Sequence, residues 1–214
     1  KKFAIRDSIV QNCGTLPIHN GSDTITEYGG GHGIHLSVSS NITVQNCECY
    51  NNGANGIFLY ACDKIQLLNN YSHHNGMSGI QLGFGRLEDN TYVIDGNICE
   101  SNIADGLDIN NASNLGIISI KASVTNNKFR NNGWYGTKST QDGSGICTLI
   151  NVCDVSISNN YSENSNRTGL FIQNCNNVNV ISNIIKKESN SLGEGIYINN
   201  SSNVNVVGNN IITN

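Results

Sequence analysis

A glycine followed by isoleucine or leucine recurs along the whole chain and constrains the fold more than any other feature. The glycines stand at spacings of 23, 23, 27, 39, 24 and 26 residues and are Gly33, Gly56, Gly79, Gly106, Gly145, Gly169 and Gly195. Each begins a short run in which apolar residues alternate with others, as in GIHL, GIFL and GIYI. A recurring period of this size is the signature of a repeat architecture, in which each repeat packs only on its neighbours.

The alternation and the period together predict the fold class. Alternation with period 2 is typical of β-strands, whose successive side chains point to opposite faces. In four repeats a second alternating run begins nine residues after the glycine, at Ile42, Ile65, Val178 and Val204. Two or three short strands per repeat of about 23 residues indicate an all-β, single-stranded right-handed parallel β-helix, with residues 1–214 as one domain. The chain lacks the leucine pattern of leucine-rich repeats and the 3.6-residue period of helical solenoids.

Asparagine pairs mark a corner of the predicted coil. The pairs are Asn69-Asn70, Asn126-Asn127, Asn159-Asn160 and Asn209-Asn210. Asparagine tolerates left-handed backbone, and its amide can hydrogen-bond the coils above and below. We expect the repeat glycine to supply a similar bend before the first strand.

The strand after each glycine is expected to separate a buried row from an outward row. The predicted buried column is Ile34, Ile57, Ile80, Leu107, Ile146, Leu170 and Ile196. The next residue points outward and gives the column His35, Phe58, Gln81, Asp108, Cys147, Phe171 and Tyr197. The residue before each glycine gives a second column, His32, Asn55, Ser78, Asp105, Ser144, Thr168 and Glu194.

The eight cysteines are interpreted as free structural thiols. Cys13 and Cys47 both stand in the phrase VQNC, and Cys62 and Cys175 both lie six residues after a repeat glycine. Equivalent positions in different coils predict stacked columns, in which free cysteine behaves as a small apolar residue. The CEC sequence that ends at Cys49 lacks the CxxC spacing of zinc modules.

Composition argues against two classes of partner and leaves the chain's extent open. Only 13% of residues are charged and the formal net charge is −4, so no electrostatic footprint for nucleic acid is visible. No apolar run approaches the roughly 20 residues of a membrane helix. The chain opens inside a repeat phrase and stops at a corner without a cap, so we expect it to be a fragment of a longer chain.

Two acidic residues in one middle coil are the candidate site. Asp105 and Asp108 would lie on the outer face, with the aromatic residues Phe58 and Phe171 in coils on either side. Insertions within residues 83–90, 110–123 and 131–144 flank this rung, and loops that project from a rigid scaffold often carry sites. The insertions add the candidates Arg86, Asp89, Trp134, Tyr135 and Asp142. A carboxylate pair can serve as general acid and base, or it can hold Ca²⁺ together with Asp89 and Asp142.

The repeat grammar resembles the right-handed β-helix superfamily of carbohydrate-binding and sugar-processing proteins, which includes polysaccharide lyases, polygalacturonases, mannuronan epimerases and phage tailspikes. ADGLDI (104–109) resembles the polygalacturonase motif N-T-D-G-x-D, and GHG (31–33) resembles that family's G-H-G. These matches imply catalytic roles for Asp105 and His32. YGGGHG (28–33) and the segment 78–109 are similar to stretches of the mannuronan epimerases, which implies roles for Tyr28 and His32.

The resemblance implies a protein that acts on a uronate-type polysaccharide as a lyase, a C5-epimerase or a glycoside hydrolase. The catalytic candidates are Asp105, Asp108, His32, His35 and Arg86. The candidates for substrate binding are Phe58, Gln81, Trp134, Tyr135, Phe171 and Tyr197. The alternative is a module without catalysis, such as a tailspike or adhesin segment that binds glycan or serves as a spacer. Either reading favours an extracellular, cell-surface or virion location, and a tailspike would form homo-oligomers.

Overall fold

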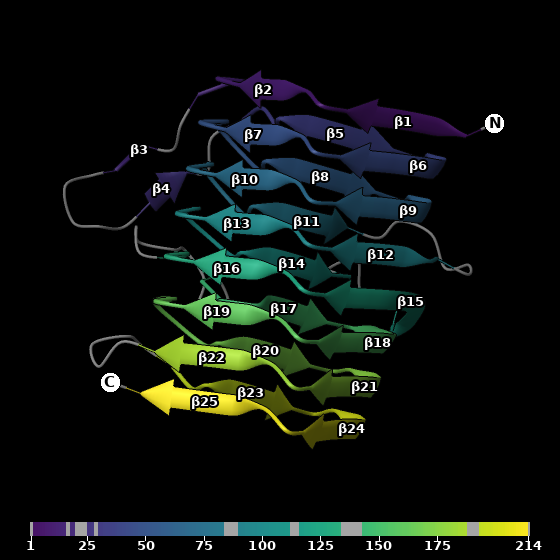
Figure 1. Ribbon diagram of the computed structural model, residues 1–214, viewed down its shortest axis with the longest axis vertical. Coiled ribbons are helices and arrows are strands. Elements are labelled where there is room, and N and C mark those ends of the chain that lie inside the picture. Colours follow the sequence, from purple (N-terminus) through teal and green to yellow (C-terminus); the bar gives the residue numbers. More distant parts are fainter. Residues whose placement is uncertain are drawn as a thin grey trace.

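The chain forms a parallel β-helix whose coils stack from β1 to β25, with the two termini at opposite ends (Figure 1). The computed structural model describes residues 2–15, 18–19, 25–27, 30–83, 90–111, 116–133, 143–187 and 193–213. Within these ranges every regular element is a strand. They contain no helix that is long and apolar enough to cross a membrane.

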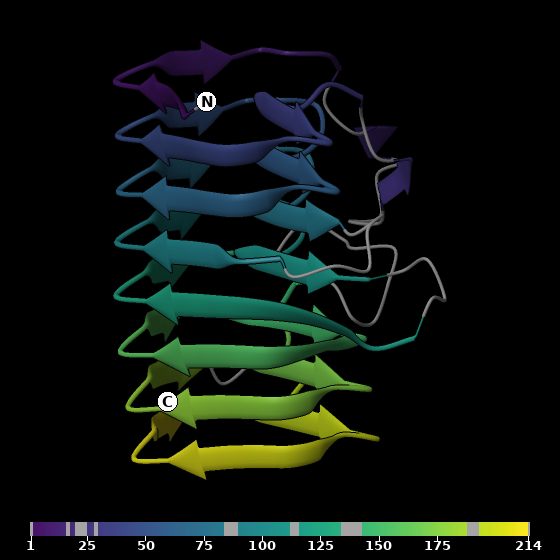
Figure 2. The same ribbon diagram turned by 90° about the vertical axis from the view of Figure 1, so that its right-hand side faces the viewer.

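Three long parallel sheets run along the solenoid, and their strands lie over one another from coil to coil (Figure 2). Sheet I consists of β5 (Ile34–Ser37), β8 (Ile57–Tyr60), β11 (Ile80–Gly83), β14 (Leu107–Asn110), β17 (Cys147–Ile150), β20 (Leu170–Gln173) and β23 (Ile196–Asn199). Sheet II consists of β1 (Phe3–Arg6), β6 (Ser40–Gln45), β9 (Asp63–Leu68), β12 (Tyr92–Asp95), β15 (Ile118–Thr125), β18 (Val152–Ser158), β21 (Asn176–Ile181) and β24 (Ser202–Val207). Sheet III consists of β2 (Ile9–Gln11), β7 (Glu48–Tyr50), β10 (Tyr71–His73), β13 (Ile98–Glu100), β16 (Lys128–Arg130), β19 (Tyr161–Glu163), β22 (Ile184–Lys187) and β25 (Asn210–Thr213). A short antiparallel pair, β3 (Ile18–His19) and β4 (Ile25–Glu27), lies beside the first coils in Figure 1.

The core is one continuous cluster of buried apolar side chains between the three sheets. In sheet I the register confirms the predicted column for six of its seven residues. Ile34, Ile57, Ile80, Leu107 and Leu170 are buried, and Ile196 at the last rung is half-buried. The prediction for Ile146 is wrong in register, because Cys147 pairs with Leu170 and occupies the core column. Ile146 is still buried, as the extra residue of a bulge between Gly145 and β17.

The repeat glycines have a different role from the predicted bend. None of the seven has a positive φ. Instead, a Cβ on Gly106 would lie 2.5 Å from the carbonyl oxygen of Gly145 and 2.5 Å from the Phe129 ring. The coil therefore needs glycine because the neighbouring coil approaches closely, which leaves no room for a side chain.

At three of the four predicted corners the asparagine pair behaves as predicted, and its two members have different roles. Asn69, Asn126 and Asn159 have positive φ values of 52°, 56° and 56°, so in these three pairs the first member turns the chain. The second member of these three pairs belongs to a side-chain ladder that connects Asn70, Asn97, Asn127, Asn160, Asn183 and the half-buried Asn209. At the fourth pair the positive φ falls on Gly208, and the first member, Asn209, is the ladder residue. Neighbouring members of this ladder are between 23 and 33 residues apart, so the coils vary around the predicted length. A second buried ladder that the pair pattern does not predict joins Asn52, Asn75, Asn102 and Asn132.

All eight cysteines are free thiols, as predicted. Cys62 and Cys175 lie at equivalent positions after sheet I strands, because each thiol contacts the carbonyls of two sheet I residues. The predicted equivalence of Cys13 and Cys47 is wrong. The N–H of Cys47 donates to Asn70 of the first ladder, whereas the N–H of Cys13 donates to Asn52 of the second ladder.

Candidate functional site

A row of hydrogen-bonded side chains crosses four coils on the outer face of sheet I. The Nδ2 of Asn55 lies 3.3 Å from the Nδ1 of His32 and donates to the Oε1 of Gln81 at 2.6 Å. The Nε2 of Gln81 then donates to the Oδ2 of Asp108 at 2.7 Å. Strand pairing places Gln81 opposite Asp108, so this last step of the row follows directly from the register. The outer face of sheet I is thus a preorganised polar surface.

The acidic rung lies in the middle of this face, and both of its carboxylates are largely covered. Asp105 is 1% exposed and Asp108 is 7% exposed. The Oδ1 of Asp105 accepts from the N–H of Ser144 at 2.7 Å and from the hydroxyl of Thr148 at 3.2 Å. The same two carboxylates raise the pKa of the buried Cys147 thiol, after the larger effect of desolvation. This rung brings two buried carboxyl groups together at one place on the sheet.

Asp105 also stabilises a turn, and the neutral side chain of Asn55 does the same at the equivalent position of another coil. The Oδ1 of Asn55 accepts from the N–H of Ser78, the residue before the next repeat glycine, at 2.9 Å. The contact between Asp105 and the N–H of Ser144 is the same interaction in a later coil. The carboxylate of Asp108, in contrast, accepts from the side chain of Gln81 and so belongs to the row that crosses the coils.

An aromatic cluster stands at the N-terminal end of the row. The rings of His32 and Phe58 stack with centroids 4.5 Å apart, and His35 lies 5.0 Å from Phe58. Burial lowers the pKa of His32, and the neighbouring His35 lowers it further. Because the N–H of Asn55 donates to the Nδ1 of His32 at 3.3 Å, the neutral ring carries its proton on Nε2. His32 is therefore a hydrogen-bond donor at neutral pH.

A second aromatic cluster stands at the C-terminal end of the same face. Phe171 and Tyr197 stack with centroids 5.0 Å apart, beside a pocket of about 220 Å³ that Arg167 and Glu194 also line. Phe171 keeps the predicted place in the outward column, but its side chain is only 7% exposed. Burial lowers the pKa of nearby Lys187 to about 8, and the charge of Glu194 opposes that shift.

The structure places the predicted residues in three groups along one face. His32, His35 and Phe58 meet at one end, Gln81, Asp105 and Asp108 lie in the middle, and Phe171 and Tyr197 meet at the other end. His32 and Asp105 stand three coils apart, about 14 Å at the usual strand spacing, so they do not form one catalytic pair. Arg86, Asp89, Trp134, Tyr135 and Asp142, with Tyr28, lie outside the described residues.

The predicted Ca²⁺ site depends on residues that the structure does not describe. Among the described residues, no group of three or more His, Cys, Asp or Glu side chains could hold a metal ion. Asp105 and Asp108 alone supply two carboxylates, fewer than Ca²⁺ usually takes. The contribution of Asp89 and Asp142 stays a prediction.

Thr148 is the site residue that the sequence pattern missed. The bulge after Gly145 puts Thr148 opposite Asp108, in the outward place predicted for Cys147. Its hydroxyl contacts both Asp105 and the Oγ of Ser144, at 3.2 and 2.9 Å. The signal was present in ICTLI, where the apolar residues flanking Thr148 fit the alternation only after a shift of one residue.

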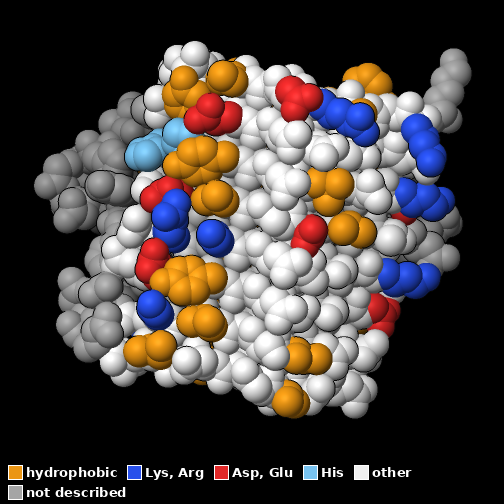
Figure 3. Space-filling model, viewed as in Figure 1, with side chains coloured by type: hydrophobic (Ala, Val, Ile, Leu, Met, Phe, Trp, Pro, Cys, Tyr) orange, Lys and Arg blue, Asp and Glu red, His pale blue; other side chains and the backbone are white. Residues whose placement is uncertain are grey.

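Sheet III also displays aromatic and charged side chains, seen on the left in Figure 3, and several of these contact one another. Glu100 accepts from the hydroxyl of Tyr71 and pairs with Arg130, both at 2.9 Å. Glu48 lies 3.1 Å from the Nε2 of His73, whose ring stacks on Tyr71. Such mutual contacts are typical of a stabilising cross-strand ladder.

Comparisons with known proteins agree with this architecture. The family described as "Right handed beta helix region" matches residues 2–139. Among solved structures, the A-module of the Azotobacter vinelandii mannuronan C-5 epimerase AlgE4 is similar, with a TM-score of 0.68, 18% identity, and coverage of 100% of this chain and 57% of that one. The A-module of AlgE6 from the same organism gives a TM-score of 0.57 and 16% identity over 98% of this chain and 58% of that one.

These likenesses concern the fold, and the chain spans little more than half the length of either epimerase module. No curated protein matches the sequence. The family match covers well over half of the chain, and the parallel stacking of its coils is the architecture that the family name describes. The chain therefore belongs to the right-handed β-helix family.

Proposed function

We propose that the chain acts on an acidic polysaccharide along the outer face of sheet I, with Asp108 as the reactive carboxylate. The observation that carries this proposal is the placement of Asp108 between two aromatic clusters on one outer face. Phe58 lies two coils before Asp108 and Phe171 two coils after it, each about 10 Å away at the usual strand spacing. An extended chain of sugars that crosses the coils would meet both clusters and the acidic rung.

The side chains of the face have separable roles in this proposal. The half-buried rings of Phe58 and Tyr197 offer apolar surface to the C–H faces of sugar rings. Gln81 and the Nε2–H of His32 can bond hydroxyl or carboxylate oxygens. The carboxylate of Asp108 is held by Gln81 and can take or give a proton beside the bound sugar. Asp105 positions the rung through Ser144 and Thr148.

The reaction class follows from which proton moves. Abstraction beside a uronate carboxylate leads to a lyase or a C5-epimerase, whereas protonation of the glycosidic oxygen leads to a hydrolase. The likeness to epimerase A-modules in fold supports the first pair. A uronate polymer incubated with the protein, with and without Ca²⁺, separates these classes. A rising enoate absorbance marks a lyase, new reducing ends without it mark a hydrolase, and exchange of solvent deuterium into intact polymer marks an epimerase.

Asp108→Asn tests the carboxylate itself. We expect turnover to fall by about 10²- to 10⁴-fold, the usual contribution of general acid–base catalysis, with the melting temperature unchanged. Asp105→Asn should keep the turn, because Asn55 already makes the equivalent bond to Ser78. The matched control is Asp95→Asn on sheet II, which removes the same charge away from the face. Full turnover by Asp108→Asn would contradict the proposal.

A binding module without catalysis is the second candidate. The ladder-like contacts of Asp105, which Asn55 reproduces without a charge, favour it. In this case the polymer binds, none of the three reactions occurs, and Phe58→Ala weakens binding more than Asp108→Asn does.

A further inference from the structure

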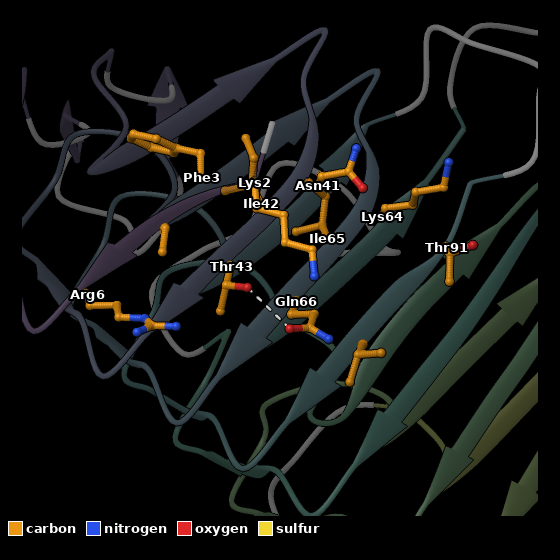
Figure 4. A pocket seen from close by; sticks show the side chains of 12 residues that line it. Lys2, Phe3, Arg6, Asn41, Ile42, Thr43, Lys64, Ile65, Gln66 and Thr91 are labelled. Carbon is orange, nitrogen blue, oxygen red and sulfur yellow. Dashed lines mark hydrogen bonds between the residues drawn. The ribbon is translucent and has the colours of Figure 1, made fainter.

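A second groove lies on sheet II, away from the row of side chains on sheet I. Its volume is about 470 Å³, and it crosses β1, β6, β9 and β12 (Figure 4). The floor is the outward register column Ala4, Thr43, Gln66 and Val93. In this column the hydroxyl of Thr43 donates to the Oε1 of Gln66 at 3.2 Å. We call this surface the sheet II groove.

Positive charge surrounds the sheet II groove. Lys2, Arg6 and Lys64 line it, and none of its lining residues is Asp or Glu. In the described part of the chain, no carboxylate lies within ion-pair distance of Lys2 or Arg6. Lys64 contacts its neighbour Asp63 at 3.3 Å, an exposed pair of the kind that contributes little. On a protein with a formal net charge of −4, this is a local concentration of cations, and two of the three have no ion-pair partner among the described residues.

The spacing of the cations favours an extended ligand. Phe3 pairs in register with Ile42, and Ile42 with Ile65, so the residues before Phe3 and Ile65, Lys2 and Lys64, stand two coils apart, about 10 Å. Lys2 and Arg6 lie four residues apart along one extended strand, about 13 Å. A single small anion could pair with only one of these groups. A linear polyanion that lies along the groove could pair with several of them.

We propose that the sheet II groove binds a carboxylated polysaccharide as an accessory surface. Charge complementarity supplies the attraction, and the hydroxyl and amide groups of Thr43, Gln66 and Thr91 are suited to sugar hydroxyls. Proteins that bind single-stranded nucleic acid stack successive bases on several aromatic rings, whereas this groove has only Phe3. Figure 3 shows Lys and Arg side chains gathered along the right-hand edge, over sheet II. The inference does not require catalysis on sheet I.

The test compares two double variants that remove equal charge. Lys2→Gln/Lys64→Gln changes the groove, and Lys128→Gln/Lys186→Gln changes two cations on sheet III. Affinity is measured for an end-labelled long oligouronate, a short one and a neutral glucan, at low and high salt. We expect the groove variant to lose about 2- to 30-fold in affinity for the long oligouronate at low salt, from two exposed ion pairs. Salt should reduce the difference, and the control should keep the parent affinity.

Each other outcome overturns the proposal. Equal losses of affinity in the two double variants would mean a general charge effect. No loss of affinity in either variant would mean that the sheet II groove does not bind the oligouronate. Equal affinity for long and short oligouronates, or full competition by inorganic phosphate, would mean a site for a small anion. Tighter binding of a single-stranded oligonucleotide with the same dependence on Lys2 and Lys64 would mean a nucleic-acid surface. Turnover by Asp108→Asn is measured in a separate assay. A negative result there would not change the interpretation of the affinities of the groove variants.

Discussion

Replacement of Asn127 by alanine would remove the middle of the corner ladder. The Oδ1 of Asn127 accepts from the N–H of Asn97 at 2.8 Å and from its Nδ2 at 3.0 Å. The Nδ2 of Asn127 donates to the carbonyl of Ile94 and to the Oδ1 of Asn160, both at 2.9 Å. Asn127 has no positive φ, so alanine brings no backbone strain, and the effect isolates the side-chain bonds.

The magnitude follows from the groups left behind. The N–H of Asn97 and the carbonyl of Ile94 are buried and lose the partner that this side chain supplies. The Nδ2 of Asn97 keeps its bond to Leu67, and Asn160 still accepts from the backbone of Asn127. A buried group without its partner costs roughly 1–3 kcal/mol, so two of them should lower the free energy of unfolding by about 2–6 kcal/mol.

Guanidinium denaturation followed by circular dichroism measures this loss. The matched control is Asn205→Ala, since Asn205 is exposed and bonds only across the outer face to Asn179, at 3.3 Å. Surface changes of this kind usually stay within about 0.5 kcal/mol. Hydrogen exchange should also show lost protection at the amide of Asn97. Equal midpoints for the two variants would refute the view that the ladder stabilises the stack.

Two further changes test the core. Ile80→Asp places an unpaired carboxylate in a fully buried column and should lower the free energy of unfolding by several kcal/mol. The control Ile184→Asp, at a position 39% exposed on sheet III, should lower it much less. Equal melting temperatures for the two variants would mean that the register is wrong. Alkaline pH should destabilise the fold, because burial raises the pKa of Cys49 to about 12 and raises that of Cys99 further, while unfolded thiols ionise near 9. Above pH 9 the unfolded chain holds fewer protons than the folded chain, so the contribution of these two thiols to the free energy of unfolding should fall by up to about 3 kcal/mol per pH unit. The variant Cys49→Ala/Cys99→Ala should flatten this decline when melting is followed against pH. An unchanged slope would contradict the burial of Cys49 and Cys99.

The amino-acid sequence alone determined the architecture, because a solenoid is built from local signals that repeat. Alternation after Gly56 and Gly79 sets which side chains face the core, and one coil predicts the next. The asparagine corners are equally local, since left-handed backbone at Asn69 and Asn126 depends mainly on the residue itself.

Contacts between coils determined the features of the structure that the sequence pattern does not predict. The register of Thr148 depends on a bulge whose position is visible only when β17 pairs with its neighbours. The need for glycine at Gly106 comes from a carbonyl that lies 39 residues further along the chain. The sheet II groove joins Lys2 and Lys64, which no sequence motif connects. Periodicity specifies which residues face outward, but only the stacked coils determine which of those residues meet, because each contact depends on the lengths of the intervening loops.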